Sequence, residues 1–575
     1  MESFRVTEPG AIGLLYETDQ LPFDLPPNGW NFAYNVRFHN GDAEAARGWL
    51  KRFTLDEPCK QLTYNTGING NYWIALGSTS IYSIQDAFLV ADVTRGASTV
   101  KVNYTSDAWH THSFQGVPIA TNGVNLPQVQ FVAGQAPGAL TEFIDLPNWP
   151  TTDRCNLLVG YKNFMVALNL TENGNNYPTK ITWSDAAAPG DLPSSWDVDD
   201  PTTLAASLVL PADTGPIVAA EVLRDDLIIY TTNAVHRLTF VGGAYVMQRR
   251  EITKNFGAFG PHSVLHARGQ HIVLTRDDLI AFDGNQGRSI AQARARRILQ
   301  NAITAAERGA ARIAYNSAFN EIWFGMVFPL QKGFFTTFNV AGFDDGAIAQ
   351  RQAPSLVDFA ELPDRESTDR VAFGAYAWDQ IAQLPDIDGW DKVGDMSWDT
   401  SAQKGSPDDY YVMGLGSDGS VYRMDYGYEF QPYTEYETRL EKTDLNITGD
   451  ENAAVVLAAY PRFTTEQLLQ TPPVRTWDEI GTKGTFWDGS DGGDPDYSAY
   501  AWDQFFDGRI PPSLYVGSQQ AAGEAVNWRE GKKLEGQRKV TCKARGVRHG
   551  LKIVSQGHPW RLSGYDLEYE PSGRR

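Results

Sequence analysis

The chain has 575 residues, of which 12% are aromatic and 53 are glycine, and its formal charge at neutral pH is −21. An acidic surface of this kind repels polyanions, so the composition excludes a protein that grips nucleic acid over most of its surface. Three cysteines are too few for a disulfide scaffold, no stretch reaches the ~18 uninterrupted apolar residues of a membrane span, and the first residues lack the order of a signal peptide.

The N-terminal segment, residues 1–55, carries early Pro and Gly residues and then the stretch Asn28–Gly41, which is followed by Arg47-Gly48-Trp49. Asn40-Gly41 is a turn pair that a tight β-hairpin favours, because both central residues of such a turn need positive φ. We therefore expect an N-terminal β segment that packs on a separate platform domain.

The most regular stretch comes later in the chain, as two similar units of strands and polar turns. They begin at Ile217 and Ser263, 263 − 217 = 46 residues apart, which is within the ~40–50 residues of one propeller blade. Looser copies occur at 72–84, 157–168, 312–324 and 410–424. Since a single blade cannot bury both faces, blades must pack radially. The pattern predicts an all-β fold with a β-propeller of about six blades over residues 56–435.

Two acidic, Trp-rich stretches, 358–407 and 476–512, interrupt the strand pattern, and the hexapeptide Ala-Tyr-Ala-Trp-Asp-Gln occurs once in each. Their Trp-Asp pairs do not follow the ~40–45 residue period of WD40 repeats. We interpret them as surface excursions whose exposed aromatic tips contact a neighbouring subunit. The candidate contact residues are Trp378, Trp390, Trp487 and Trp502.

Residues 436–575 return to a strand-like pattern and, after a closed propeller, need a sheet of their own. We predict a β-sandwich-like platform here, completed by the N-terminal segment. Nine basic and two acidic residues between Arg529 and Lys552 give this strip a net charge of +7. We expect it to face an acidic surface of a neighbouring subunit or ring, through Arg529, Lys532, Lys533, Arg538, Lys539, Lys543 and Arg545. The alternative is a solvated strand edge whose charges prevent aberrant pairing.

Searches for reactive sites give no catalytic constellation. His110 and His112 lie on one face of a predicted strand, a spacing able to hold a metal, but no third ligand is evident, so structural histidines are favoured. An EF-hand loop that opens at Asp488 needs Glu at its twelfth position, where Ala499 stands. No nucleophile elbow, Walker loop or dinucleotide fingerprint occurs in a supporting context. We therefore expect no enzyme activity, no metal and no cofactor.

Several short motifs follow one another in an order that spans nearly the whole chain: Asn35-Val-Arg-Phe38, Gln115–Pro127, Lys180–Asp185, Ala281–Gly284, Asn320–Trp323 and Trp560–Glu570. In this order the chain resembles the tail nozzle (tail tubular) proteins of podoviruses, the short-tailed bacteriophages. The resemblance implies a virion structural protein without catalytic function, in which a β platform joins the propeller.

The resemblance also implies partners and a place of action. Six subunits would form a ring around the DNA exit channel, attached to the adaptor ring below the portal and contacted by tail fibres or spikes. Double-stranded DNA would pass without sequence-specific binding, so the ring would retain the packaged genome and conduct it during ejection. The protein would be assembled in the host cytoplasm and reside in the virion tail.

Two other classes remain open. In a carbohydrate-binding or carbohydrate-active propeller, the exposed Trp side chains of the two excursions would stack on sugar rings. In a protein-scaffold propeller, the loops would present binding sites to protein partners.

Overall fold

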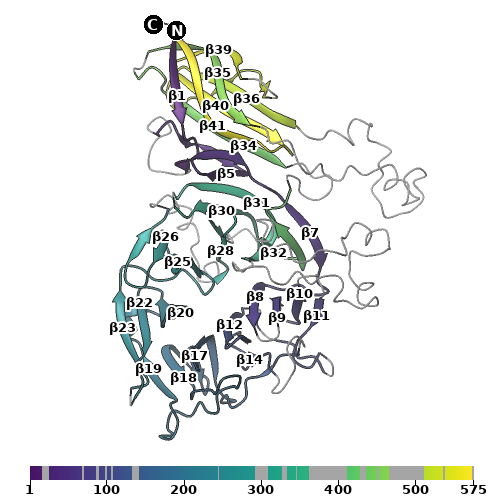
Figure 1. The fold of residues 1–575 in the computed structure, drawn as a ribbon, viewed down its shortest axis with the longest axis vertical. Helices are drawn as coiled ribbons and strands as arrows, with labels where there is room; N and C mark the ends of the chain where they lie inside the picture. Colours follow the sequence, from purple (N-terminus) through teal and green to yellow (C-terminus); the bar gives the residue numbers. More distant parts are fainter. Residues whose placement is uncertain are drawn as a thin grey trace, which may run out of the picture. The chain divides into compact units, whose positions relative to one another are not determined.

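A computed structural model describes residues 1–15, 25–67, 70–85, 90–97, 100–104, 106, 108–131, 141–243, 245–291, 309–326, 333–344, 346–361, 411–427, 436–449, 452–464, 510–534 and 538–572. The chain forms two compact units (Figure 1). The platform consists of Met1–Leu50, Asp345–Gln352 and Asp425–Arg575, and the propeller consists of Lys51–Asp344 and Ala353–Met424. The platform is therefore discontinuous, and it includes a short central segment that the sequence analysis assigned to the propeller.

The described part of the propeller unit contains five consecutive antiparallel sheets of four strands each. The first two sheets are β8 (Gln61–Gly67), β9 (Gly70–Leu76), β10 (Ile81–Gln85), β11 (Val90–Asp92), and β12 (His110–Phe114), β13 (Val117–Thr121), β14 (Gln128–Val129), β15 (Ile144–Asp145). The third and fourth are β16 (Arg154–Tyr161), β17 (Phe164–Glu172), β18 (Asn175–Trp183), β19 (Ala206–Val209), and β20 (Ile217–Leu223), β21 (Asp226–Thr231), β22 (Val235–Phe240), β23 (Met247–Thr253). The fifth is β24 (Val264–Ala267), β25 (Gln270–Leu274), β26 (Leu279–Phe282) and β27 (Gly287–Ser289).

Two further sheets, which β31 joins through its pairing with both β30 and β32, complete the series. The sixth contains β28 (Arg312–Asn316), β29 (Glu321–Gly325) and β30 (Phe335–Gly342). The seventh contains the second half of β31 (Ile348–Glu361), β32 (Val412–Gly416), β33 (Ser420–Met424) and β7 (Trp49–Thr54). Each of the six predicted units lies in a different one of these seven sheets, and β12–β15 is the additional one.

Tight turns set the register of the hairpins. Between β17 and β18, Asn173 and Gly174 have φ of 45° and 80°. Between β12 and β13, Gln115 and Gly116 have φ of 50° and 82°. Such pairs of positive φ angles give the turn twist that matches two antiparallel strands. Asn40 and Gly41, the turn pair predicted from the sequence, have φ of 51° and 80° and connect β5 (Val36–His39) to β6 (Asp42–Ala45).

The first strands of successive sheets contact one another in order, from β8 through β12, β16, β20 and β24 to β28, and β32 of the seventh sheet returns to β8. Figure 1 shows these sheets arranged as a ring. The apolar clusters lie between neighbouring sheets, because alternate residues of a strand point to opposite faces. On β16, Leu157 and Val159 pack toward the fourth sheet, whereas Leu158 packs toward the second. The fold is thus a β-propeller.

The ring is closed by strands from distant parts of the sequence. β7 pairs with β33, and just beyond it the Leu55 amide donates a hydrogen bond to the Gly419 carbonyl oxygen at 2.9 Å. The hydroxyl oxygens of Thr54 and Ser420 are 3.4 Å apart. The sequence predicts residues 51–54 as part of the N-terminal segment that packs on the platform, but they belong to β7, which completes the last propeller sheet.

The platform is a β-sandwich of two sheets. The first sheet has the order β39-β35-β41-β6-β5, with β1 also paired to β41, and the second has the order β4-β34-β40-β36, with β37 and β38 paired to β36. Their strands are β1 (Glu2–Thr7), β4 (Phe32–Tyr34), β5 (Val36–His39), β6 (Asp42–Ala45), β34 (Glu437–Leu445), β35 (Ala454–Thr464), β36 (Ile510–Gln519), β37 (Asn527–Trp528), β38 (Lys532–Lys533), β39 (Val540–Gly546), β40 (Arg548–Gln556) and β41 (Arg561–Pro571). One apolar core joins them, with Val456 and Leu567 from the first sheet against Leu440 and Ile553 from the second.

No helix among the described residues is long and apolar enough to cross a membrane.

Candidate functional site

Ionisable side chains gather on the first strands of the propeller sheets, and the two histidines of β12 are among them. The Leu158 amide donates to His110 Nδ1 at 3.4 Å, and the Gly160 amide donates to His112 Nδ1 at 3.2 Å. Both amides belong to β16, the first strand of the next sheet. Side chains at i and i+2 share one face of a strand. The imidazoles of His110 and His112 therefore face two β16 amides that are also two residues apart. The histidines therefore satisfy backbone donors that would otherwise face an unpaired strand edge.

His112 also contacts an acid from a third sheet. Its Nε2 is 3.4 Å from Glu221 Oε1 of β20, and the two side chains keep 16% and 33% of their surface exposed. Burial lowers the pKa of His112, but the charge of Glu221 and its hydrogen bond outweigh burial, so that the pKa of His112 is raised. At Glu221, burial raises the pKa, but the neighbouring imidazoles, His112 foremost, outweigh burial and lower the pKa to about 2. The geometry favours a charged carboxylate beside a histidine whose pKa is raised.

The neighbouring histidines are held neutral. Burial, together with the charge of His112, lowers the pKa of His110 to about 4. His271 of β25 contacts the Tyr230 hydroxyl through Nδ1 at 2.9 Å and the Val222 carbonyl through Nε2 at 3.2 Å, and burial lowers its pKa. The fifth sheet thus contacts the first strand of the fourth through His271.

A buried acid joins the seventh sheet to the first. Asp358 of β31 accepts hydrogen bonds from the Leu62 amide at 2.8 Å and from its neighbour Phe359 at 2.9 Å. Arg312 of β28 lies 3.1 Å away, and the two side chains are only 5% and 11% exposed. Burial raises the pKa of Asp358 to about 6, although Arg312 opposes the shift.

These groups, His110, His112, Glu221, His271, Arg312 and Asp358, form what we call the axial cluster. It consists of contacts between neighbouring sheets and of the His112–Glu221 pair, which joins the second sheet to the fourth. Most of its donors and acceptors are used by backbone groups. No three His, Cys, Asp or Glu side chains among the described residues are arranged to hold a metal ion. Within the axial cluster, His112 can take up a proton beside the negatively charged side chain of Glu221.

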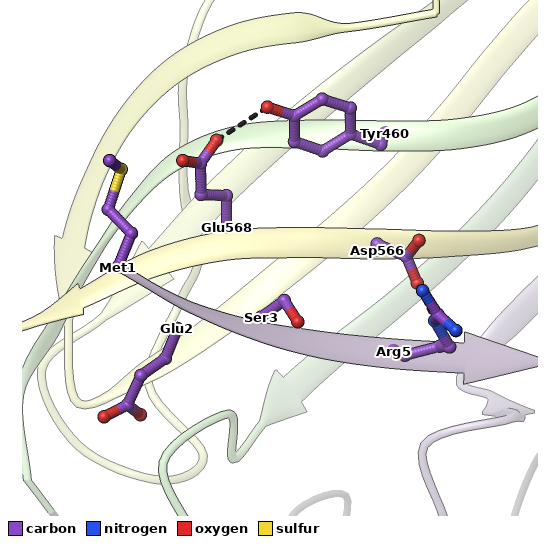
Figure 2. Close-up of a pocket in the computed structure, with 7 residues that line it drawn as sticks. All are labelled: Met1, Glu2, Ser3, Arg5, Tyr460, Asp566 and Glu568. Atoms are coloured by element: carbon purple, nitrogen blue, oxygen red, sulfur yellow. Dashed lines mark hydrogen bonds and ion pairs between the residues drawn. The ribbon is translucent and has the colours of Figure 1, made fainter.

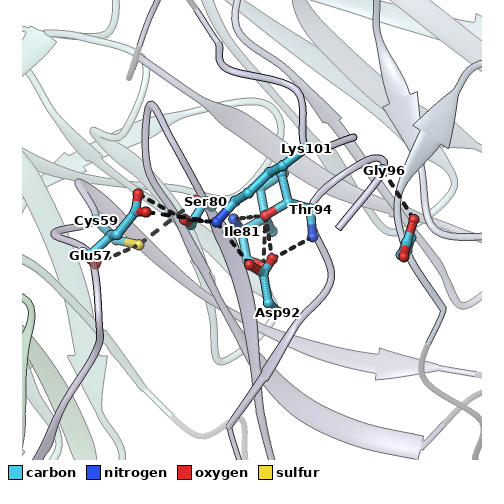
Figure 3. Close-up of polar contacts among 9 residues, drawn as sticks. Glu57, Cys59, Ser80, Ile81, Asp92, Thr94, Gly96 and Lys101 are labelled. Atoms are coloured by element: carbon cyan, nitrogen blue, oxygen red, sulfur yellow. Dashed lines mark hydrogen bonds and ion pairs between the residues drawn. The ribbon is translucent and has the colours of Figure 1, made fainter. Parts of the chain in front are cut away.

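A second polar group fixes the loop after the first sheet (Figure 3). Lys101 Nζ lies 2.8 Å from Asp92 Oδ2 and 3.8 Å from Glu57 Oε1, and it donates to Ser80 Oγ at 2.5 Å. Beside it, Cys59 is buried, and burial raises the pKa of its thiol to about 12. A buried, protonated thiol is a poor nucleophile, so Cys59 is not expected to react. The role of the polar group around Lys101 is to hold the loop in place.

The predicted basic strip falls on two strands at one side of the platform. Lys532 and Lys533 form β38, paired with β36 in the second sheet, whereas Lys543 and Arg545 project from β39, the outermost strand of the first sheet. β36 and β39 contact each other, so the two strands lie at the same side of the sandwich. All seven predicted residues are exposed: Arg529, Lys532, Lys533, Arg538, Lys539, Lys543 and Arg545.

One strip residue, Lys539, contacts the outer face of the first platform sheet. A shallow pocket on that face is lined by residues of β1, by Tyr460 of β35, and by Asp566 and Glu568 of β41 (Figure 2). Tyr460 donates a 2.7 Å hydrogen bond to Glu568, and Lys539 Nζ lies 3.5 Å from the same carboxylate and over the Tyr460 ring. Lys539 is therefore partly neutralised within its own subunit, a pairing that the sequence did not reveal.

The other predicted contact residues, Trp378, Trp390, Trp487 and Trp502, lie outside the described residues, as do the Asp488 loop and most of both excursions.

Comparisons with known proteins give structural likeness only. No family model and no curated protein matches the chain. Selenomethionine-substituted virginiamycin B lyase from Staphylococcus aureus is 11% identical over 65% of this chain and 97% of its own, with a TM-score of 0.35. YCF48 from Cyanidioschyzon merolae is 10% identical over 66% of this chain and 98% of its own, with a TM-score of 0.35. The fold described above rests on the sheets of this chain itself.

Proposed function

We propose that the protein is a virion structural subunit, the tail nozzle of a short-tailed phage, which assembles into a ring around a DNA exit channel. The observation that carries the proposal is the discontinuous platform. N-terminal, central and C-terminal segments share one sandwich, so the propeller is an insertion within the platform. A platform joined to a propeller in this way is the architecture that the motif resemblance implies.

The residues on which the resemblance depends hold the platform segments together. Asn35 Nδ2 donates to the Glu437 carbonyl at 2.7 Å, and Asn35 Oδ1 accepts from the Gln352 amide at 2.8 Å. One side chain therefore links all three segments. Near it, Arg37 and Arg351 both face the buried carboxylate of Asp425, at 2.5 and 3.6 Å. These contacts give a physical reason for the Asn-Val-Arg motif in a platform of this design.

The mechanism we propose is mechanical and electrostatic. An acidic chain lining a channel would repel DNA at short range and so prevent adhesion of the duplex, because salt screens the repulsion beyond ~8 Å. The subunit would form a hexamer below the adaptor ring, carry tail fibres or spikes, and conduct double-stranded DNA. No bond is made or broken in this role.

Electron microscopy and light scattering of the purified chain test the proposal. We expect closed rings with a central hole and, for six subunits of 63.7 kDa, a mass of about 382 kDa. Monomers at all concentrations would contradict it. Monomers that bind a glycan array would support the carbohydrate-binding alternative instead, and monomers that capture defined protein partners would support the scaffold alternative.

A further inference from the structure

The exposed basic region of the platform lies on edge strands of both platform sheets. Among the strands that the structure describes, β39 pairs only with β35, and β38 pairs only with β36. Thr541, Lys543 and Arg545 alternate with buried or half-buried residues along β39, so their side chains project from one face. We call Arg529, Lys532, Lys533, Arg538, Lys543 and Arg545 the basic edge; all six are exposed.

Most of these charges have no acid nearby. Lys532 lies 3.4 Å from Glu530, but within the described residues Arg529, Lys533, Arg538, Lys543 and Arg545 take part in no ion pair. The strip from Arg529 to Lys552, which contains the basic edge, has a net charge of +7 in a chain of −21. Opposed charged patches of this kind give association its orientation and specificity. The basic edge therefore fits an acidic protein surface.

The chain itself offers such a surface. Residues 181–223 contain no Lys or Arg and seven acids: Asp185, Asp191, Asp197, Asp199, Asp200, Asp213 and Glu221. Within this stretch, residues 185–203, which we call the acidic loop, connect β18 to β19 at the outer end of the third propeller sheet. Asp191, Asp197 and Asp199 are exposed and lie in no ion pair with any described residue.

The acidic loop is ordered by its own contacts. Asp185 accepts a hydrogen bond from the Leu204 amide at 3.0 Å, and the Asp197 carboxylate accepts one from the Asp199 amide at 3.0 Å. Trp196 is buried and packs edge-on against Trp149, with ring centroids 4.6 Å apart. A preorganised surface loses little conformational entropy on binding, which favours its use as an interface.

We propose that the basic edge of one copy docks against the acidic loop of a second copy. The inference rests on the proposed ring, because a contact between two different patches is head-to-tail and can close into a ring. DNA is the other polyanion that a basic edge could bind. The overall charge of −21 repels DNA, whereas the acidic loop is a local surface of opposite sign, so the observations favour the second copy.

Charge reversal tests the contact. The first variant, Lys543→Glu with Arg545→Glu, reverses the basic edge, and the second, Asp191→Lys with Asp199→Lys, reverses the acidic loop. A matched control, Arg250→Glu with Arg276→Glu, makes the same charge change at two exposed propeller residues that form no ion pair with any described residue. Thermal melting of each variant establishes that the folds are intact.

We expect each reversed variant to raise the concentration at which assemblies dissociate at least about tenfold at low salt, since like charges then face each other. An equal mixture of the two variants should assemble again, because alternating subunits in a six-membered ring bring opposite signs together at every contact. A chain that carries all four substitutions should also assemble. Added salt should weaken wild-type assemblies, and the control should behave like wild type.

The outcomes separate the two proposals. If the reversed-edge variant forms rings as stable as those of wild type, the proposed contact is wrong and the proposed ring stands. Restoration in the fourfold variant but not in the mixture would place the contact within one chain and would also overturn it. Normal assembly with lost binding to a short DNA duplex would make the basic edge a DNA surface. Open oligomers that the mixture restores would support the contact but refute the closed ring, and a wild-type chain that never self-associates would refute both.

Discussion

The two nitrogens of His112 have different partners in the two protonation states. When the ring is neutral, Nδ1 accepts from the Gly160 amide at 3.2 Å and Nε2–H faces Glu221 at 3.4 Å. When the ring is protonated, Nδ1–H can donate to the Ser113 carbonyl at 2.8 Å, and the Gly160 amide then loses its acceptor. Protonation therefore exchanges a contact between sheets for one within β12 and its turn.

The pH dependence of stability should reflect this site. Because the pKa of His112 is raised, its contribution is full below about pH 6.5 and is lost as the pH rises through the folded-state value. His110 has the opposite sign: its pKa is lowered to about 4, so stability is lost as the pH falls from about 6.5 toward 4.

Glu221→Gln removes the charge that raises the pKa of His112. We expect the histidine pKa, followed by NMR titration, to fall, and the decline of the melting temperature above about pH 6.5 to become shallower. Asp225→Asn is the control, since that side chain is 97% exposed. An unchanged His112 titration in Glu221→Gln would show that the ion pair does not govern it.

At the scale of the strand, close contact between β12 and β16 depends on Gly160. A Cβ atom there would lie 2.4 Å from the Ser113 carbonyl oxygen and 2.9 Å from Phe114 Cα, and both neighbours are backbone atoms that cannot rotate away. We expect Gly160→Ala to destabilise the propeller by about 1–3 kcal/mol, measured by denaturant unfolding.

Gly309→Ala is the matched control, because a Cβ at Gly309 meets open space and its backbone φ is not in the left-handed region. Equal effects of the two substitutions would mean that β12 and β16 are not in close contact.

Strands joined by polar turns could be predicted from sequence, but short strands could not. The pattern of strands and turns does not predict the sheet β12–β15, because β14 and β15 have two residues each and Pro118 interrupts the β13 pattern. Local periodicity cannot detect a strand that exists only because its neighbours supply hydrogen bonds.

For the candidate sites too, local sequence patterns predict which residues share a strand face, but they do not predict partners that lie far away in the sequence. Alternation placed His110 and His112 on one face, but the partner Glu221 comes 221 − 112 = 109 residues later and depends on sheet order. The composition of residues 529–552 predicts a basic strip. Its division between β38 and β39, and the pairing of Lys539 with Glu568, can be seen only in the structure. Residues 51–54 looked like a continuation of the N-terminal segment, because nothing local indicates a strand whose partner is β33.

At the scale of the whole molecule, the contact between β7 and β33 that closes the propeller can be cross-linked by a disulfide. The hydroxyl oxygens of Thr54 and Ser420 are 3.4 Å apart, so cysteines at both positions are well placed to form a disulfide. We expect Thr54→Cys with Ser420→Cys, in a Cys542→Ser background, to gain about 2–4 kcal/mol when oxidised. Calorimetry with and without reductant measures the gain.

Thr54→Cys alone in the same background is the control and should melt at one temperature in both redox states. No gain on oxidation of the double variant, once mass spectrometry has verified the bond, would mean that unfolding does not require separation of β7 from β33.

The closing strand also determines when the propeller can be finished during synthesis. The ribosome makes Thr54 366 residues before its partner Ser420. At about 5–20 residues per second, β7 waits on the order of 20–70 s for β33. During that interval the first six sheets can form one by one, but the ring stays open and its two end sheets remain uncovered. Those seconds are when the nascent chain is most exposed to pairing with another copy, and the charged residues Lys51 and Arg52 within β7 oppose such pairing.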